Sequence, residues 1–256
     1  MKKNKSETKL ALIACAAALS ACGGGGGSDN PAAIAAAEGV YGGTLTGSTY
    51  PAFELLVLEN GDFWSMYGIQ GSSGFSVAGF VQGTGISNNG TFTAAQSKDF
   101  GYSPALAVST NASYDPTAKT ISGTLTAATG AVRFSGGPIA GSLYNYNTAA
   151  TQSTVAGAWS ATSLSGERVA LTVSAGGAFT ATSSAGCGFS GSVTPRASGK
   201  NVFNVALTFG ASPCALPGQT ATGIALAYPL ASGQTQLVVA VTDATRTYGS
   251  GLIASR

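Results

Sequence analysis

The sequence predicts an all-β protein with two tandem small antiparallel barrels of about eight strands each, after a signal peptide and a flexible linker. Three observations support this prediction. From residue 39 onward apolar and polar residues alternate with a period of two, turn signals interrupt the alternation about every ten residues, and the whole pattern occurs twice. Closed barrels remove the exposed edges that an open sheet of such strands would carry.

Alternating apolar side chains mark individual strands in both halves of the chain. The clearest runs are residues 53–57, 63–69, 169–173, 203–209 and 237–241. Turn-forming pairs such as Asn60-Gly61 and Ser198-Gly199 separate the runs. We therefore expect short strands joined by tight turns and almost no helix after the signal peptide.

An internal repeat divides the chain. Gly39-Val40-Tyr41 opens the first unit and Gly157-Ala158-Trp159 opens the second, and each unit ends in a strand that carries an arginine followed by glycine. The predicted boundaries are 39–145 for the first barrel domain, 146–155 for a linker and 156–256 for the second barrel domain.

The N-terminus has the three zones of a secretory signal. Lysines come first, an uncharged apolar run covers residues 10–19, and small residues lead to Cys22. The apolar run is too short for a permanent membrane span. The block Leu19-Ser20-Ala21-Cys22 resembles the bacterial lipobox, which implies a signal peptide over 1–21 and a diacylglyceryl group on Cys22. An ordinary signal peptide that contains a cysteine is the alternative.

Residues 22–38 form the predicted tether. Five glycines, Gly23 to Gly27, resist both helix and strand and favour a flexible coil. A cysteine followed by polyglycine resembles the tethers of Neisserial-type surface lipoproteins. In enteric bacteria an aspartate directly after the lipidated cysteine tends to retain a lipoprotein in the inner membrane. Here Gly23 follows Cys22, so the resemblance implies that the protein is anchored in the outer membrane of a Gram-negative bacterium, at the cell surface or on the periplasmic face.

Two cysteines remain in the body of the chain. Cys187 and Cys214 would be alone together in an oxidising compartment, and we expect a disulfide between them. On the chain-entropy model it would stabilise the fold by about 3–4 kcal/mol.

The composition argues against enzymes and nucleic-acid binding. The chain has no histidine, which excludes His-containing triads and His-bearing zinc sites. Charged residues make up only 9% of the chain, and loss of the signal peptide leaves it close to neutral, so no basic patch remains for nucleic acid. We expect no cofactor and no metal site.

The few charged side chains fit structural positions. Lys98, Lys119 and Lys200 lie in turn-like contexts, where a solvated lysine is the expectation. We interpret Asp62 as turn chemistry and Glu54 as solvent-facing. The sequence therefore predicts a protein without enzymatic activity.

The second unit resembles lipocalin and avidin-like barrels. In lipocalins an arginine of the last strand covers the tryptophan of a first-strand Gly-x-Trp motif. The resemblance implies a stack of Trp159 with Arg246, and of Tyr41 with Arg133 in the first unit, by cation–π contact. Such pairs are structural and name no ligand.

Two functions remain open from the sequence. The first is a non-enzymatic binding or structural module at the cell envelope, with an extracellular protein as a possible partner. The alternative is a lipocalin-like periplasmic carrier of a small apolar ligand. Rows of Phe, Leu and Val predict filled interiors, and an exposed aromatic face with Trp64 and Met66 would favour the binding module. An internal cavity bounded by Trp159 would favour the carrier, while the partner and the oligomeric state stay open.

Overall fold

The structure is a computed structural model that describes residues 35–71, 74–139, 141–230 and 232–256. The predicted signal peptide, Cys22 and the tether as far as residue 34 lie outside the described residues. In the described part of the chain, no helix is long and apolar enough to cross a membrane.

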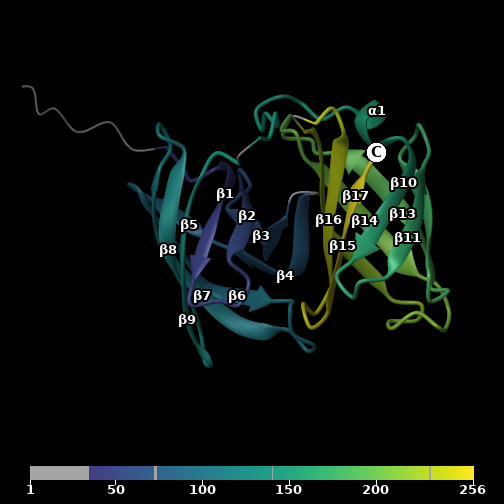
Figure 1. Ribbon diagram of the computed structural model, residues 1–256, viewed down its shortest axis with the longest axis horizontal. Coiled ribbons are helices and arrows are strands. Elements are labelled where there is room, and N and C mark those ends of the chain that lie inside the picture. Colours follow the sequence, from purple (N-terminus) through teal and green to yellow (C-terminus); the bar gives the residue numbers. More distant parts are fainter. Residues whose placement is uncertain (1–34, 72–73, 140, 231) are drawn as a thin grey trace, which may run out of the picture. The chain divides into compact units, whose positions relative to one another are not determined.

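The first barrel forms from antiparallel strands that pair mostly with their neighbours in sequence (Figure 1). Strand β4 pairs with β6 through Val81–Asp99 and Gln82–Lys98, which closes the sheet, and the short strand β5 extends β6. The strands are β1 (Gly39–Thr46), β2 (Ala52–Val57), β3 (Asp62–Gly71), β4 (Gly74–Thr84), β5 (Ile86–Asn88), β6 (Thr91–Asp99), β7 (Leu106–Asp115), β8 (Thr120–Ala127) and β9 (Gly130–Gly137).

The second barrel follows a single-turn helix, α1 (Gln152–Val155), and closes where β10 pairs with β17. Its strands are β10 (Gly157–Ser163), β11 (Arg168–Val173), β12 (Ala178–Ser183), β13 (Gly188–Pro195), β14 (Phe203–Phe209), β15 (Thr220–Pro229), β16 (Thr235–Asp243) and β17 (Gly249–Ser255). Within the described residues each closed barrel therefore has eight strands, and the predicted fold class is confirmed.

Alternation puts one side of each strand inside its barrel. In the first barrel, aromatic rings fill the interior: Phe63 meets Phe92 edge-on at 5.6 Å between ring centroids, and Phe53 meets Phe134 at 5.7 Å. In the second barrel, many of the buried inward residues are small. These include Ala161, Ala181, Ala221, Ala225 and Ala254. The two interiors thus differ in side-chain volume although their topology repeats.

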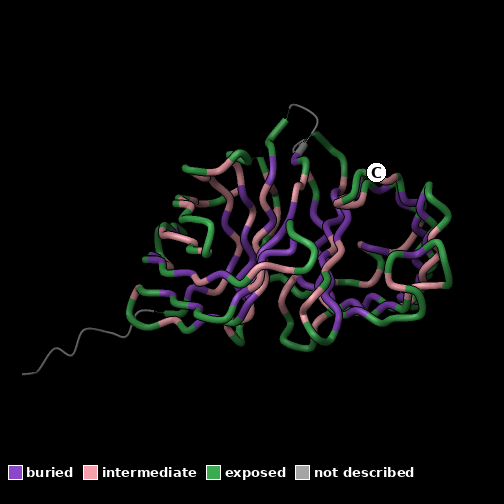
Figure 2. The backbone as a smooth tube through the Cα atoms, turned by 90° about the horizontal axis from the view of Figure 1, so that it is seen from below, coloured by how far each residue is buried: buried purple, intermediate pink, exposed green. Residues whose placement is uncertain are grey.

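A third apolar layer lies between the barrels. Residues 33–256 make one compact unit, and the outward faces of β2, β3 and β4 pack with those of β15 and β16 (Figures 1 and 2). Trp64 stacks on Phe80, which stacks on Phe100. Trp64 and Met66 are therefore buried in this layer, as Phe63 is inside the first barrel, and they form no exposed aromatic face.

At the edge of this layer the backbone of Gly249 lies close to the ring of Phe100. A Cβ added to Gly249, at the start of β17, would lie 2.5 Å from Cδ1 of Phe100. Real Cβ atoms do not approach so closely, so the contact between the barrels requires glycine here.

The segment between the barrels is packed as well. Tyr146 is buried in the inter-barrel layer, and the hydroxyl of Tyr144 donates to the carbonyl of Asn201. Lys200 pairs with Glu38 at 2.5 Å and lies over the Tyr146 ring, 5.0 Å from its centroid. The hydroxyl of Tyr146 also donates to Oε2 of Glu59 in the first barrel at 3.5 Å, so the segment contacts both barrels.

Glu54 does not face solvent, so that expectation is wrong. It is half-buried on β2, and the hydroxyl of Tyr228 on β15 donates to its Oε2 at 3.2 Å. Burial raises the pKa of Glu54 to about 7, although the hydrogen bond from Tyr228 lowers it. Packing of the outer faces of β2 and β15 removes this carboxyl from water.

The raised pKa predicts a pH-dependent stability. The folded state favours protonated Glu54, so the free energy of unfolding should fall as the pH rises from about 4.5 through 7. Glu54→Gln keeps an oxygen for Tyr228 and removes the charge, and should raise the free energy of unfolding at pH 8 by roughly 1–2 kcal/mol with little change at pH 4.5. Urea unfolding at both pH values measures this, and an equal effect at both would contradict it.

Candidate ligand-binding site

The second barrel contains a cavity of about 210 Å³. Inward side chains of β11 and β16 line much of its wall, among them Leu171, Leu237, Val239 and Val241. The expectation of a filled interior is therefore wrong for this barrel. Of the inward alanines named above, Ala225 lines the cavity, and the others lie outside its lining. Alternation predicts which side chains point inward but not whether they meet across the barrel, so it gives no signal for this space.

The floor of the cavity is at Val155 of α1, which Trp159 of the first strand holds in place. Val155, the last residue of α1, is fully buried and lines the cavity, and Nε1 of Trp159 donates to its carbonyl at 2.8 Å. The indole thus holds the helix against the barrel end. The cavity is closed at this end by Val155, and Trp159 lies behind it.

The arginine that covers Trp159 is Arg256, and the predicted pair with Arg246 is wrong. The guanidinium of Arg256 lies 4.0 Å from the centroid of the indole, and it donates to the carbonyls of Ala156 at 2.6 Å and Thr154 at 3.0 Å. Arg246 lies past the end of β16, in a turn, whereas Arg256 follows directly after β17 and reaches the closed end.

Arg246 instead joins the two barrels. Its guanidinium donates to the carbonyls of Gln82 at 2.8 Å and Gln96 at 3.3 Å, both in the first barrel. Its positive φ of 54° is that of a turn residue and not of a strand.

The first barrel has an equivalent aromatic residue at its closed end, but no arginine covers it within the described residues. The hydroxyl of Tyr41 donates to the carbonyl of Ala37, four residues earlier, at 2.8 Å, as Trp159 does to Val155. Arg133 is exposed on β9 and makes no cation–π contact with Tyr41 within the described residues, so this predicted pair is also wrong. Tyr41 and Trp159 therefore occupy equivalent positions and make equivalent hydrogen bonds, but only Trp159 is covered by an arginine among the described residues.

Aromatic rings form one part of the cavity wall. Phe179, Phe189 and Phe209 come from the adjacent strands β12, β13 and β14, with centroids 6.4 Å and 6.0 Å apart along the row. Phe189 and Phe209 are only half-buried. They present ring surface that a bound apolar group could cover.

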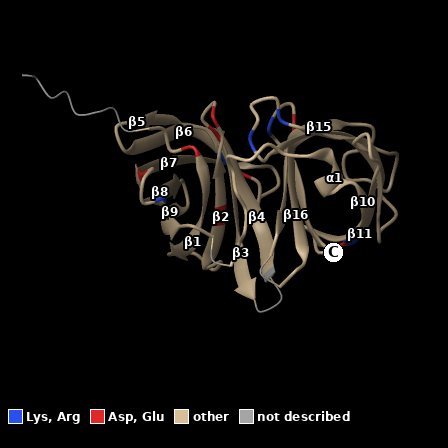
Figure 3. Cartoon of the chain, turned by 90° about the horizontal axis from the view of Figure 1, so that it is seen from above, with Lys and Arg blue, Asp and Glu red and all other residues tan. Residues whose placement is uncertain are grey.

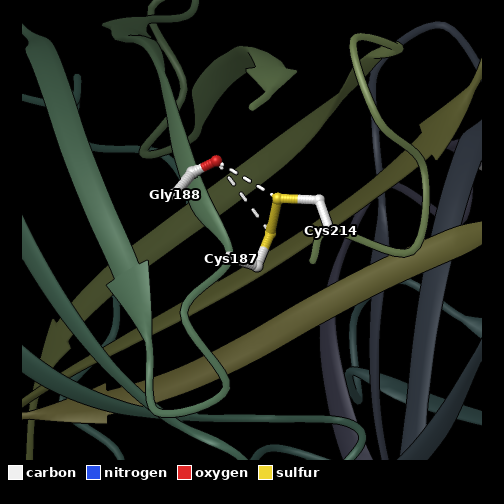
Figure 4. The surroundings of a disulfide bond; sticks show 3 residues. All are labelled: Cys187, Gly188 and Cys214. Carbon is white, nitrogen blue, oxygen red and sulfur yellow. Dashed lines mark hydrogen bonds between the residues drawn. A yellow bond between two sulfur atoms is a disulfide. The ribbon is translucent and has the colours of Figure 1, made fainter. Parts of the chain in front are cut away.

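The mouth lies opposite Val155, where the cavity reaches exposed loop residues. Ser165, Ala185, Pro213 and Ala215 line it and are exposed to solvent. The predicted disulfide between Cys187 and Cys214 is confirmed, with Cα atoms 4.5 Å apart, and Cys187 lines the cavity. The carbonyl oxygen of Gly188 lies 3.3 Å from Sγ of Cys214 (Figure 4). The bond ties the loop after β14 to the turn before β13 at the rim.

Charge is sparse throughout the molecule (Figure 3). Glu167 is the one charged side chain among the described residues that line the cavity, and it is half-buried. Asp62 has the expected turn contacts, because Nδ2 of Asn60 donates to its Oδ2 at 2.8 Å and its N–H donates to Oδ1 of Asn60 at 3.2 Å. It also accepts from Thr84, its cross-strand partner on β4, at 2.6 Å. The expectation of a solvated turn lysine is wrong for Lys98, which lies within β6, paired with Gln82 of β4, and is half-buried. It lies outside the cavity lining.

Comparison with known proteins adds little to this geometry. No family model and no curated protein matches the sequence. Among solved structures, Aeromonas veronii immune modulator A is similar with a TM-score of 0.36 and 13% identity, over 88% of this chain and 96% of that chain.

The corrected pair predicts different effects for the two arginines. Arg256→Ala removes the cation–π contact and two hydrogen bonds, so it should lower the free energy of unfolding by about 1–2 kcal/mol and shift the fluorescence of Trp159. Arg246→Ala should leave the Trp159 emission unchanged. Denaturant unfolding and emission spectra in a Trp64→Phe background measure both, and a shift caused by Arg246→Ala alone would contradict the assignment.

Proposed function

We propose that this protein binds a small apolar ligand inside its second barrel and acts as a carrier at the bacterial cell envelope, held to the outer membrane by a lipid on Cys22. The observation that carries the proposal is the apolar cavity, closed at Val155 and open at the rim. Small eight-stranded barrels either fill their interior with side chains or hold one small ligand.

The size of the cavity limits the ligand. An apolar cavity of about 150 Å³ admits benzene, so about 210 Å³ suits a bicyclic ring or a short alkyl chain. The phenylalanine row offers ring surface for either kind of group. A longer ligand would extend through the mouth.

The cavity favours the carrier over the surface binding module. The binding module was expected to use an exposed face with Trp64 and Met66, and the inter-barrel layer covers both residues. The exposed aromatic side chains among the described residues are the tyrosines Tyr50, Tyr102 and Tyr248. The packed first barrel then serves as a support that covers the outer faces of β15 and β16. The proposal includes no catalytic step.

Filling the cavity should abolish ligand binding. Val239 lines the cavity and is half-buried, so Val239→Phe should lower the affinity for the fluorescent probe N-phenyl-1-naphthylamine at least about tenfold, because the added ring takes the space of the probe. Fluorescence titration of the two proteins measures the change.

A surface variant of the same strand system is the control. Ala170→Phe adds a ring on the exposed face of β11 and should leave the affinity unchanged. No probe binding to the unsubstituted chain, or equal binding by the Val239→Phe variant, would overturn the carrier proposal.

The anchor is tested separately. Cys22→Ser removes the acyl acceptor, so the protein should leave the membrane fraction and lose incorporation of labelled palmitate. Protease treatment of intact cells expressing the unsubstituted protein then distinguishes the two faces of the membrane. Resistance until the outer membrane is permeabilised is expected for a periplasmic carrier, and loss from intact cells would contradict the periplasmic site.

A further inference from the structure

The polar groups of the cavity are confined to one part of its wall. Ser250 lies on β17, Ser163 ends β10, Glu167 precedes β11 and Ser183 ends β12. Strands β17, β10, β11 and β12 are successive neighbours in the closed barrel. The polar side chains therefore occupy one continuous arc, which we call the polar arc.

The strand register puts these residues at the same end of the barrel. Ser163 pairs with Leu252, two residues from Ser250, and its N–H donates to the carbonyl of Glu167 at 2.9 Å. Ser183 pairs with Val169, two residues from Glu167. The polar arc thus lies at the mouth, away from Val155.

The opposite arc is apolar. It carries Phe189, Phe209, Pro213 and Ala215, which line the cavity from β13, β14 and the loop after β14. A ligand at the mouth therefore meets polar groups on one side and apolar groups on the other.

Ser183 contributes a buried, unpartnered hydroxyl to the polar arc. Its side chain is 8% exposed, faces inward with Phe179 and Ala181, and lines the cavity. Its Oγ has no hydrogen-bond partner among the described residues. A buried hydroxyl without a partner destabilises the fold, so a bound polar group that meets it would gain a hydrogen bond.

Glu167 determines which charge the arc accepts. The described lining residues include no lysine or arginine to neutralise it. An ammonium group near this half-buried carboxylate is attracted and a carboxylate is repelled, and both effects grow as water is excluded.

We infer that the ligand is an amphiphile whose short alkyl or aryl part fills the cavity and whose head group is a hydroxyl or a primary amine, bound by Ser183 and Glu167. Carboxylates such as fatty acids are disfavoured. This inference rests on the proposed function, because it specifies the ligand class of the same cavity.

Competition for the probe tests the inference. The full chain carrying Cys22→Ser is loaded with N-phenyl-1-naphthylamine and titrated with octylamine, 1-octanol and octanoate, which share one alkyl length and differ in head group. Octylamine should compete at least about tenfold better than octanoate, with 1-octanol between them.

Substitutions in the arc separate charge from hydrogen bonding. Glu167→Gln should remove most of the preference for octylamine, and Glu167→Lys should reverse it in favour of octanoate. Asp115→Asn, which removes an exposed carboxylate at the end of β7 in the first barrel, is the matched charge control and should leave the order of the three competitors unchanged. Ser183→Ala should weaken 1-octanol about threefold or more while the protein keeps or gains thermal stability.

The outcomes distinguish the two proposals. If the probe does not bind, or Val239→Phe binds it normally, the carrier proposal and this inference both fail. If the probe binds in the cavity but the three octyl compounds compete equally, or Glu167→Gln leaves their order unchanged, the carrier proposal stands and the assignment of the ligand class is overturned.

Discussion

Burial of β15 and β16 on both faces is the constraint on which the rest of the structure depends. One face of this strand pair, with Ala225, Leu237 and Val241, lines the cavity, and the other, with Leu226 and Val238, packs against the first barrel. Strands buried on both sides are near-continuously apolar, and these two are. The wall of the cavity is thus supported from behind. A barrel that holds an empty space loses packing contacts inside, and the layer outside β15 and β16 compensates for part of that loss.

Much of the fold could be predicted from the sequence because it depends on local periodicity. Alternation along residues 203–209, the turn at Asn60-Gly61 and the repeated Gly-x-aromatic opening determine strands, hairpins and repeat without knowledge of distant contacts. The Cys187–Cys214 pairing followed from elimination. The two-sided burial of β15 and β16 has a sequence correlate as well. Residues 224–228 are an unbroken apolar run, and in residues 237–241 the positions between the alternating Leu237, Val239 and Val241 are also apolar.

Sequence periodicity predicts less of the candidate site, because the site depends on which side chains meet across the barrel. The choice between Arg246 and Arg256 required knowing where β16 ends and which end of the barrel the last strand reaches. Glu54 looked solvent-facing because alternation places it outside its own barrel, and only the second barrel covers that outer face. Whether inward alanines leave a cavity depends on the size of the side chains opposite them, which sequence periodicity does not give.

The two barrels share a topology and differ in what their interiors do. Tyr41 and Trp159 occupy equivalent positions and each closes a barrel end by a hydrogen bond to the carbonyl four residues earlier. Above Tyr41 the first barrel is packed with phenylalanine rings, whereas above Trp159 the second has alanines, a phenylalanine row on one side and a polar arc on the other. Both barrels have the aromatic residue at the closed end and the same strand pairing, so these shared features do not require the two interiors to contain the same side chains. A duplicated barrel can therefore keep one copy as a packed support and devote the inward positions of the other to a ligand.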